Sequence, residues 1–270
     1  MTEFRGWGGA ALVTGATSGI GLEIARALAA RQMDLILVAR SAGNLRVVSQ
    51  QLASAHRVRV VPVAYDLSTP DVGSTLGEVF REIDLEIDLL VNNAAFAVYG
   101  PFANQGPERE AEMIRLNTIA PTLLTAMFLP GMVRRRRGVV LNVASTAGFA
   151  PVPFLGSYAA SKAHLISWTH ALDTELKGTG VRCSVLCPGS TSTNFQRVSG
   201  AAERQRRRFK QQTALEVAEQ AMVGLDKGRR VITTSRKHRL HQILSRVVPP
   251  GLAASLAMSA MKPKGKAIPG

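Results

Sequence analysis

The sequence predicts an α/β fold whose parallel sheet is covered by helices on both faces. Short apolar runs alternate with helix-length amphipathic runs from residue 10 to residue 234, a pattern typical of such folds. With 270 residues, the chain is long enough to bury the core of one large domain. Apolar residues make up 46% of the chain and charged residues 19%, proportions that exclude a disordered protein.

Seven runs are expected to be strands because they are short, apolar and bounded by turn residues. They are residues 10–14, 34–39, 58–64, 87–91, 139–143, 181–187 and 230–234. Helices are expected after residue 21, around Asn117, over residues 157–177 and over residues 214–226. Residues 194–212 are polar, rich in arginine and without periodicity, which predicts either a mobile lid or an unstructured loop.

A glycine-rich turn joins the first strand to the first helix. Between Thr14 and Gly21 the sequence has the spacing Gly-x-x-x-Gly-x-Gly. Glycines at this place let backbone amides approach a pyrophosphate, and the amino end of the helix favours its negative charge. The second strand ends at Ala39 and Arg40, without the acid that usually binds the ribose 2′-hydroxyl of NAD. This favours NADP; a plain glycine turn and a solvated arginine are the competing interpretations.

Polar residues also end the third and fourth strands. Asp66 closes the third strand, and residues 92–95 (Asn-Asn-Ala-Ala) follow the fourth. The small side chains leave room for a flat ring or a backbone, although asparagines also simply close turns. Further along, Pro121 leaves the carbonyl of Asn117 without its helical amide partner. This predicts a kinked, polar spot that faces the site and holds a water.

Tyr158 and Lys162 stand four residues apart in a segment expected to be helical, so their side chains share one face. A neighbouring ammonium favours the phenolate, and it therefore lowers the pKa of a phenol from about 10 towards neutrality. Such a phenol exchanges protons at working pH. Ser145 follows the fifth strand, at the edge where open α/β sheets bind ligands. The alternative is a surface tyrosine and lysine on an ordinary helix.

Together these features resemble the short-chain dehydrogenase/reductase family over residues 9 to about 234. The resemblance implies a single-domain, Rossmann-like, doubly wound sheet of seven parallel strands in the order 3-2-1-4-5-6-7. It implies that Tyr158 is the general acid/base and that Lys162 lowers the pKa of Tyr158 and holds the nicotinamide ribose. By the same resemblance Ser145 orients the substrate, and Asn117 anchors a water in the proton relay.

The resemblance also implies the residues that bind NAD(H) or NADP(H). They are Gly15, Thr17, Ser18, Gly19, Ile20, Gly21, Arg40, Asp66, Leu67, Asn93, Ala94, Ala95, Tyr158, Lys162, Pro188, Gly189, Thr191 and Thr193. Two positions depart from the family pattern. Ala95 stands where glycine is usual, and Ser18 stands where members that prefer NADP often carry a basic residue. The preference for NADP(H) over NAD(H) therefore depends on Arg40.

Apolar and aromatic residues are expected to border a substrate pocket. They are Phe96, Val98, Tyr99, Phe149, Val152, Phe154 and Phe195. This composition favours a hydrophobic carbonyl or alcohol, such as an acyl chain, a steroid-like ring or a polyketide intermediate. Arginines at 204 and 206–208 are candidates for clamping a carboxylate or phosphate on that substrate. The function predicted is NADP(H)-dependent hydride transfer; the alternative is a cofactor-binding sensor or membrane-associated scaffold with vestigial catalytic residues.

The net charge of +14 is concentrated in clusters and in the carboxyl-terminal part, where ten Lys or Arg and no acid follow residue 226. This suits an anionic membrane surface or an acidic substrate, or simply a soluble surface; no zinc-finger or aromatic-interleaved motif supports nucleic acid. We expect a catalytic domain over residues 1–234, with a mobile substrate loop at 190–213. Residues 235–270 form a basic, amphipathic extension.

The extension is expected to contain an amphipathic helix over residues 236–248 with a basic opposite face, then a small-residue helix over 252–261. The first helix is expected to pack on its own domain or on a twin subunit, to cover the substrate pocket, or to anchor the chain on anionic lipid. The resemblance implies a homodimer or homotetramer that forms through the helices bearing Asn117 and Tyr158.

Cysteine usage indicates the compartment. Cys183 and Cys187 lie in one strand, roughly 13 Å apart, too far for a disulfide, and they form no metal site. The sequence shows no signal peptide and no run of 18 uncharged apolar residues. These features predict a cytoplasmic protein, with peripheral contact to a membrane left open.

Overall fold

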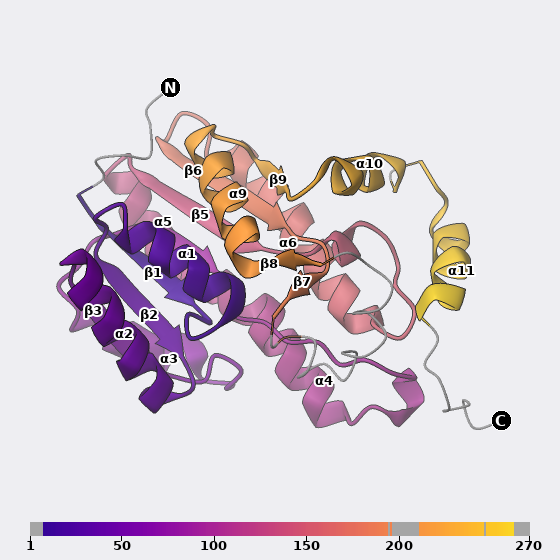
Figure 1. Cartoon of the computed structure of the whole chain (residues 1–270), viewed down its shortest axis with the longest axis horizontal. Coiled ribbons are helices and arrows are strands. Elements are labelled where there is room, and N and C mark those ends of the chain that lie inside the picture. The colour runs from indigo at the N-terminus through magenta and orange to yellow at the C-terminus, as the bar shows by residue number, and fades with distance from the viewer. Residues whose placement is uncertain (1–7, 194, 196–210, 246, 262–270) are drawn as a thin grey trace.

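The computed structural model describes residues 8–193, 195, 211–245 and 247–261. Its centre is a seven-stranded parallel sheet in the order β3-β2-β1-β4-β5-β6-β9, which confirms the predicted topology (Figure 1). The strands are β1 (Ala10–Thr14), β2 (Leu35–Ala39), β3 (Val60–Ala64), β4 (Ile87–Asn92), β5 (Gly138–Val143), β6 (Val181–Cys187) and β9 (Val231–Thr233). A separate parallel pair, β7 (Thr191–Ser192) and β8 (Gln212–Thr213), was not predicted.

Helices cover both faces of the sheet. On one face lie α1 (Gly19–Ala29), α2 (Ala42–His56) and α9 (Ala214–Asp226); on the other lie α3 (Val72–Arg81), α5 (Ala120–Arg134) and α6 (Gly156–Glu175) (Figure 1). Strand residues alternate between the two layers: Ala11 and Val13 of β1 pack under α1, whereas Ala10 and Leu12 pack on the opposite side. This two-sided burial explains why the strands are almost continuously apolar.

The remaining elements are α4 (Pro107–Ile114), the short helices η1 (Phe102–Asn104) and η3 (Thr146–Phe149), and two helices of the extension, α10 (Arg236–Leu244) and α11 (Pro250–Met261). The predicted helix over 236–248 therefore ends four residues early, at Leu244. Figure 1 shows α10 and α11 at one end of the molecule, beyond the edge of the sheet that β9 forms.

The irregularity predicted near Asn117 is present as a π-helical turn, η2 (Arg115–Ile119), between α4 and α5. The amide of Ala120 donates to the carbonyl of Arg115, five residues back, as in a π-helix. The whole run Pro107–Arg134 is long and apolar enough to cross a membrane by length and composition. One side of α5 contacts β4 and β5 in the core, whereas Ile114, Ile119 and Leu123 of the run are exposed.

A buried carboxylate explains part of the basic cluster at residues 134–137. Asp88 of β4 is fully buried; it accepts the Gly9 amide at 3.0 Å and lies 2.8 Å from Nε of Arg137 and 3.5 Å from Nη2 of Arg135. These two arginines therefore have structural partners, rather than forming a free cationic surface. The interaction fixes the start of β1 against β4 at the amino-terminal edge of the sheet.

Replacing Asp88 with alanine leaves two guanidinium groups and one buried amide without their shared acceptor. We expect the Asp88→Ala variant to lose about 3 kcal/mol of unfolding free energy, measured by denaturant titration. The matched control is Glu82→Ala, which removes an exposed carboxylate and should change stability by less than about 0.5 kcal/mol. Equal effects of the two substitutions would contradict a structural role for Asp88.

Candidate active site

The first two turns of α6 place Tyr158 and Lys162 at the carboxyl edge of the sheet, both buried. Because they stand four residues apart on a helix, their side chains point the same way. The Lys162 ammonium donates to the carbonyl of Val143, the last residue of β5, at 2.9 Å. It lies 5.8 Å from the centre of the Tyr158 ring. The spacing thus brings the two groups together, as the sequence predicted.

Ser145 lies two residues beyond β5 and caps the short helix η3. Its hydroxyl accepts the Ala147 amide at 3.1 Å and also interacts with the phenol of Tyr158, an interaction that lowers the pKa of that phenol. The ends of β5 and α6 therefore bring Ser145, Tyr158 and Lys162 into one site. A hydroxyl, a phenol and an amine at one edge of the sheet could donate hydrogen bonds, and a proton, to a substrate oxygen bound between them.

The predicted effect of Lys162 on Tyr158 is wrong for this structure. Burial raises the pKa of Tyr158 to about 12, and only the Ser145 interaction acts in the opposite direction. Burial lowers the pKa of Lys162 to about 7, against the influence of Cys187 nearby. Loss of water disfavours the charged form of each group, and it is the larger cause of both shifts in pKa. The site therefore holds a protonated phenol beside an easily deprotonated amine.

Asn117 is fully buried in the π-helical turn, where its side chain links two other elements. It donates to the Phe96 carbonyl at 2.9 Å and to the Ser161 hydroxyl at 3.1 Å, and it accepts the Phe96 amide at 3.2 Å. Ser161 in turn donates to the carbonyl of Tyr158 at 2.7 Å. Asn117 thus fixes the loop after β4 against α6. The predicted water at its carbonyl stays a prediction.

The glycine turn has the geometry of a phosphate cradle. Gly15 and Gly19 have φ of 65° and 59°, a left-handed conformation that favours glycine. A Cβ on Gly21 would collide with the side chain of Asn93 and the carbonyl of Gly15. The first turn of α1 contains no acidic residue that would repel an anion. The chain therefore fits a dinucleotide whose pyrophosphate lies against this turn.

Thr14 and Asn93 fix that turn to the end of β4. The Thr14 hydroxyl accepts the amides of Asn93 and Ala94 at 2.9 and 3.0 Å, and the Asn93 side chain donates to the Thr14 carbonyl at 2.8 Å. Thr14 was not predicted as a site residue, although its place at the end of β1 was a usable signal. Ala95 has a negative φ, so the methyl group in place of the usual glycine hydrogen causes no backbone strain.

Not all predicted cofactor residues present side chains to the site. The side chain of Ile20 packs against one core layer and that of Leu67 against the other. Only their backbones are therefore available to a cofactor. Arg40 is exposed at the end of β2 and lies 3.8 Å from Asp66 at the end of β3. Thr17 and Ser18 lie in the turn and are not buried. The structure thus brings Arg40 and Asp66 together, and their role in binding the adenosine part of a cofactor stays a prediction.

The segment after β6 closes the other side of the cradle. The carbonyl of Pro188 accepts the Thr146 amide at 2.9 Å, and Thr191 is buried in β7. Thr193 packs closely against Gly19: a Cβ atom on Gly19 would lie only 3.1 Å from the methyl group of Thr193. Residues 188–193 and the glycine turn are therefore neighbours, although about 170 residues separate them. The predicted loop arginines at 204 and 206–208 lie outside the described residues.

Five of the predicted pocket residues gather around Tyr158. They are Phe96, Val98, Tyr99, Val152 and Phe195, together with Ala97, Met113, Leu116, Ala147, Leu155 and Met261, which the prediction did not include. The Phe195 ring lies 5.5 Å from the Tyr158 ring. Phe149 was placed wrongly, because it packs under α6 with Leu165 and Val185. Phe154 belongs to no apolar cluster of the described residues.

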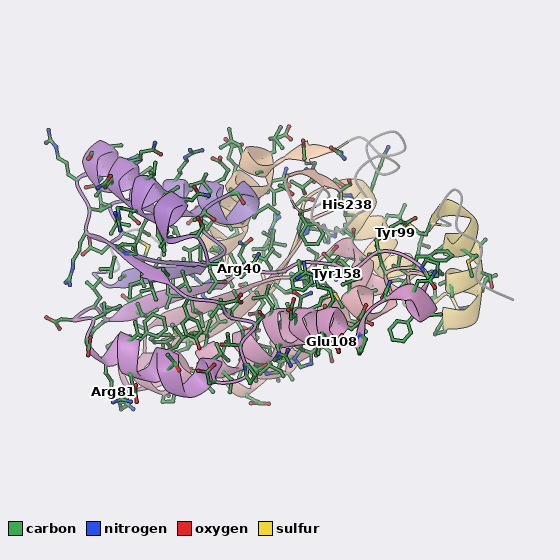
Figure 2. The ribbon with its side chains drawn as sticks, turned by 90° about the horizontal axis from the view of Figure 1, so that it is seen from below. Arg40, Arg81, Tyr99, Glu108, Tyr158 and His238 are labelled. Carbon is green, nitrogen blue, oxygen red and sulfur yellow. The ribbon has the colours of Figure 1, made fainter. Side chains whose placement is uncertain are left out.

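The extension contacts this apolar cluster directly. The Tyr99 hydroxyl donates to the carbonyl of Met261, at the end of α11, at 2.5 Å. From α10, the imidazole of His238 packs against Gly189 and lies 3.0 Å from the hydroxyl of Thr234. In Figure 2, Tyr158 lies between Arg40 and Tyr99, and His238 lies above it. Packing of the first extension helix on its own domain was one of the predicted alternatives, but the sequence pattern did not predict these individual contacts.

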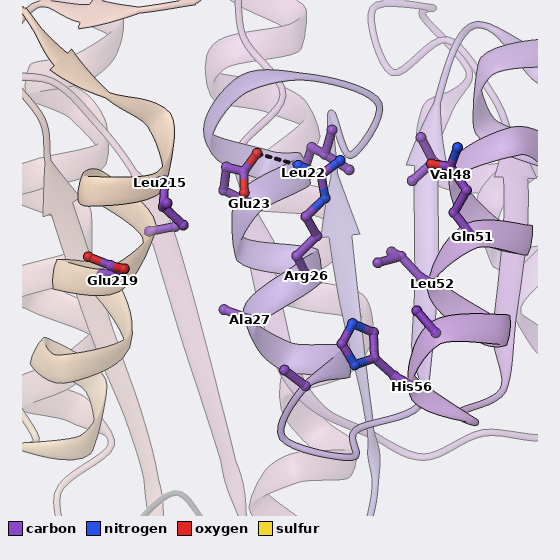
Figure 3. A pocket seen from close by; sticks show the side chains of 13 residues that line it. Leu22, Glu23, Arg26, Ala27, Val48, Gln51, Leu52, His56, Leu215 and Glu219 are labelled. Carbon is purple, nitrogen blue, oxygen red and sulfur yellow. Dashed lines mark hydrogen bonds and ion pairs between the residues drawn. The ribbon is translucent and has the colours of Figure 1, made fainter.

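A groove elsewhere on the molecule contains none of the predicted site residues. Leu22, Arg26, Leu52 and Leu215 help to line it, between α1, α2 and α9 (Figure 3). It lies on the face opposite α6, so it is separate from the site. In the part of the chain that the structure describes, no group of three or more His, Cys, Asp or Glu could hold a metal ion, and Cys183 and Cys187 are free thiols.

A family model described as short chain dehydrogenase matches residues 9–204. The chain belongs to this family. Its relatives include the ketoacyl reductase HetN of Nostoc sp. strain PCC 7120, which is 39% identical over 181 residues, 67% of this chain and 63% of the relative. A very-long-chain 3-oxoacyl-CoA reductase of Phaeosphaeria nodorum is 34% identical over 186 residues, 67% of this chain and 54% of that protein. The chain thus matches between about half and two thirds of these relatives' lengths.

Solved structures of the family resemble this one over nearly the whole chain. A short-chain dehydrogenase from Sphingobium yanoikuyae in complex with NADPH has a TM-score of 0.81 and 28% identity, covering 96% of this chain and 98% of that one. A family member from Burkholderia phymatum in complex with NAD has a TM-score of 0.80 and 28% identity, covering 93% and 98%. The family's structures therefore include complexes with both nicotinamide cofactors.

The buried ammonium predicts a pH-dependent stability. In the unfolded chain Lys162 takes up its proton near pH 10.5, whereas in the folded chain it does so near pH 7. Between these values the unfolded state binds more protons, so the free energy of unfolding rises with pH. Relative to Lys162→Met, we expect wild type to gain at least about 1 kcal/mol between pH 7 and pH 9, measured by denaturant titration.

The control for this experiment is Lys177→Met, which removes an exposed lysine from the segment after the same helix. The difference between wild type and this variant should stay constant over the same pH range. If the Lys162→Met difference is equally constant, then Lys162 is not buried as an easily deprotonated amine.

Proposed function

We propose that this protein is an NADP(H)-dependent oxidoreductase that transfers a hydride between the nicotinamide and a carbonyl or alcohol group of a hydrophobic substrate. The observation that carries the proposal is the buried Tyr158 with Ser145 and Lys162 at the sheet edge, inside an apolar cluster and beside a glycine cradle. The cofactor supplies the hydride when it is bound. The protein supplies position and the proton.

In the direction of reduction, the phenol of Tyr158 gives its proton to the substrate oxygen. Its raised pKa keeps the proton in place until an oxygen that is gaining negative charge lies within reach. The Ser145 hydroxyl donates to the same oxygen and orients it. The phenolate that remains is stabilised by the Ser145 hydroxyl and by the protonated form of Lys162, and the water proposed at Asn117 would return the proton from solvent.

The apolar cluster supports a hydrophobic substrate. Phe96, Leu155 and Phe195 belong to the apolar cluster around the phenol, and the Arg109 guanidinium packs 3.9 Å from the centre of the Phe96 ring at its margin. Because relatives are named as ketoacyl and 3-oxoacyl-CoA reductases, an acyl chain with a carbonyl is the substrate class we favour. The arginines at 204 and 206–208 would then bind an anionic carrier of that chain.

The preference for NADP(H) is supported by Arg40. Its guanidinium is exposed at the end of β2, where a 2′-phosphate lies in folds of this type. The partner Asp66 also accepts the Ser68 amide and hydroxyl, at 2.9 and 2.6 Å, so Arg40 is not its only partner. Arg40 can therefore turn to a phosphate without leaving a carboxylate unpaired.

Two further parts of the proposal concern assembly and location. Ile114, Ile119 and Leu123 are exposed on the helical run that bears Asn117, which supports a homodimer or homotetramer through that run. The free, buried cysteines in β6 support a reducing, cytoplasmic location. The rival function, a sensor or scaffold with vestigial catalytic residues, is disfavoured because the complete Ser145, Tyr158 and Lys162 set shares one site.

Removing the phenol oxygen tests the proposed acid. The Tyr158→Phe variant should bind NADPH as wild type does, because the ring is kept, yet lose at least about 100-fold in kcat. Steady-state NADPH oxidation with a panel of hydrophobic ketones measures the rate, and fluorescence titration measures binding. The matched control is Tyr65→Phe, which removes a phenol oxygen hydrogen-bonded to Thr69, outside the group of Ser145, Tyr158 and Lys162, and should keep its rate. A near-normal rate in Tyr158→Phe would remove this residue from the mechanism.

Replacing Arg40 tests the cofactor preference. The Arg40→Leu variant should raise the KM for NADPH by about tenfold or more and change the KM for NADH little, since only NADPH carries the 2′-phosphate. Arg46→Leu, which removes an exposed arginine on α2, is the control. Equal changes for both cofactors in Arg40→Leu would show that Arg40 does not select between them.

A further inference from the structure

The carboxyl-terminal helices carry an unusual share of exposed apolar surface. In the part of the chain that the structure describes, 14 large apolar side chains are exposed, and seven of them lie between residues 240 and 258. They are Leu240, Ile243, Leu244, Val247, Leu252, Leu256 and Met258, which we call the apolar ridge. Exposed apolar groups that are gathered in this way mark interaction surfaces, whereas scattered ones are ordinary.

The packing of α10 shows that the part of the apolar ridge on this helix faces away from the protein. His238 lies on the inner side of the helix, because its imidazole packs against Gly189 and lies 3.0 Å from Thr234. Leu240 and Ile243 follow by two and five residues, which places them on the opposite side of a helix with 3.6 residues per turn. Both are 56% exposed. The face of α10 that carries His238 thus makes the contact to the catalytic domain, and the apolar face is left exposed.

The surroundings of the ridge are cationic. Lys237 and Arg239 are exposed on α10 and flank the apolar side chains, and no acidic residue occurs after Asp226. An apolar stripe between cations is the composition that seats a helix in the boundary between lipid headgroups and acyl chains. Each cation near an anionic membrane strengthens binding roughly fivefold.

We propose that the apolar ridge and its flanking cations dock on an anionic lipid surface. A second copy of the chain fits less well, because a two-fold interface would bring the same cations of both copies together. The geometry gives the docking a consequence, which rests on the proposed function. Met261 at the end of α11 accepts a hydrogen bond from Tyr99 and packs in the cluster around Tyr158. Docking therefore places the substrate pocket beside the membrane, where hydrophobic substrates concentrate.

The test is co-sedimentation of the full chain with vesicles. One set contains phosphatidylcholine alone and the other contains about one third phosphatidylglycerol. We expect at least about tenfold stronger binding to the anionic set, weakening as salt is raised. Both Leu240→Asp/Ile243→Asp and Lys237→Glu/Arg239→Glu should lower that binding at least about tenfold. Since all four side chains are exposed, each variant should fold.

The matched control is Val47→Asp/Leu215→Asp, which alters side chains that are 52% and 54% exposed on the domain and should bind as wild type does. Equal binding to both vesicle sets, or equal loss in the control, would overturn the proposal. So would a lipid-free dimer, seen by sedimentation velocity, that Leu240→Asp/Ile243→Asp dissociates, because the ridge would then meet a second copy. If the protein binds anionic vesicles but turns over no ketone, the proposed function is contradicted and the docking proposal stands.

Discussion

The site depends on the burial of one amine. Lys162 joins α6 to the last carbonyl of β5, and this hydrogen bond, with that from Asn142 to Thr169, holds the helix that carries Tyr158 against the strand that leads to Ser145. The same burial removes both the amine and the phenol from water, which favours their neutral forms. The cost of burying these polar groups is offset by the hydrogen bond to Val143 and the interaction with Ser145. Position and protonation state therefore share one physical cause.

Local pattern was sufficient to predict most of the fold. Strands such as β1 and β6 have the predicted bounds because apolar runs buried on both faces are distinctive in sequence. The third strand starts at Val60 rather than at residue 58, since its ladder with β2 begins with the pair Leu35 and Val60. The spacing of Tyr158 and Lys162 was equally reliable, because the geometry of a helix depends only on the backbone.

What local pattern could not give is the environment that distant segments create. The pKa of Tyr158 depends on how completely the whole fold excludes water from the phenol. The spacing of four residues between Tyr158 and Lys162 carries no information about that. Met261 packs against the apolar cluster around Tyr158 from the end of the described chain, and its backbone carbonyl accepts from Tyr99, a contact for which side-chain periodicity has no signal. Phe149 follows Ser145 closely but packs on the other side of α6, because η3 turns the chain before it. Ser161 was missed since its role, between Asn117 and Tyr158, exists only in three dimensions.

The carboxyl-terminal extension could likewise be predicted only in part from sequence. An amphipathic pattern indicates that a helix has an apolar face, but it does not indicate what that face contacts. In α10 the inward contact is made by His238, and the apolar side chains are left outside. His238 packs on Gly189, and Thr193 of the same segment lies against Gly19 of the cofactor cradle. Contacts therefore run from α10 through residues 189–193 to the cofactor cradle, and they join the extension to the site through side chains far apart in sequence.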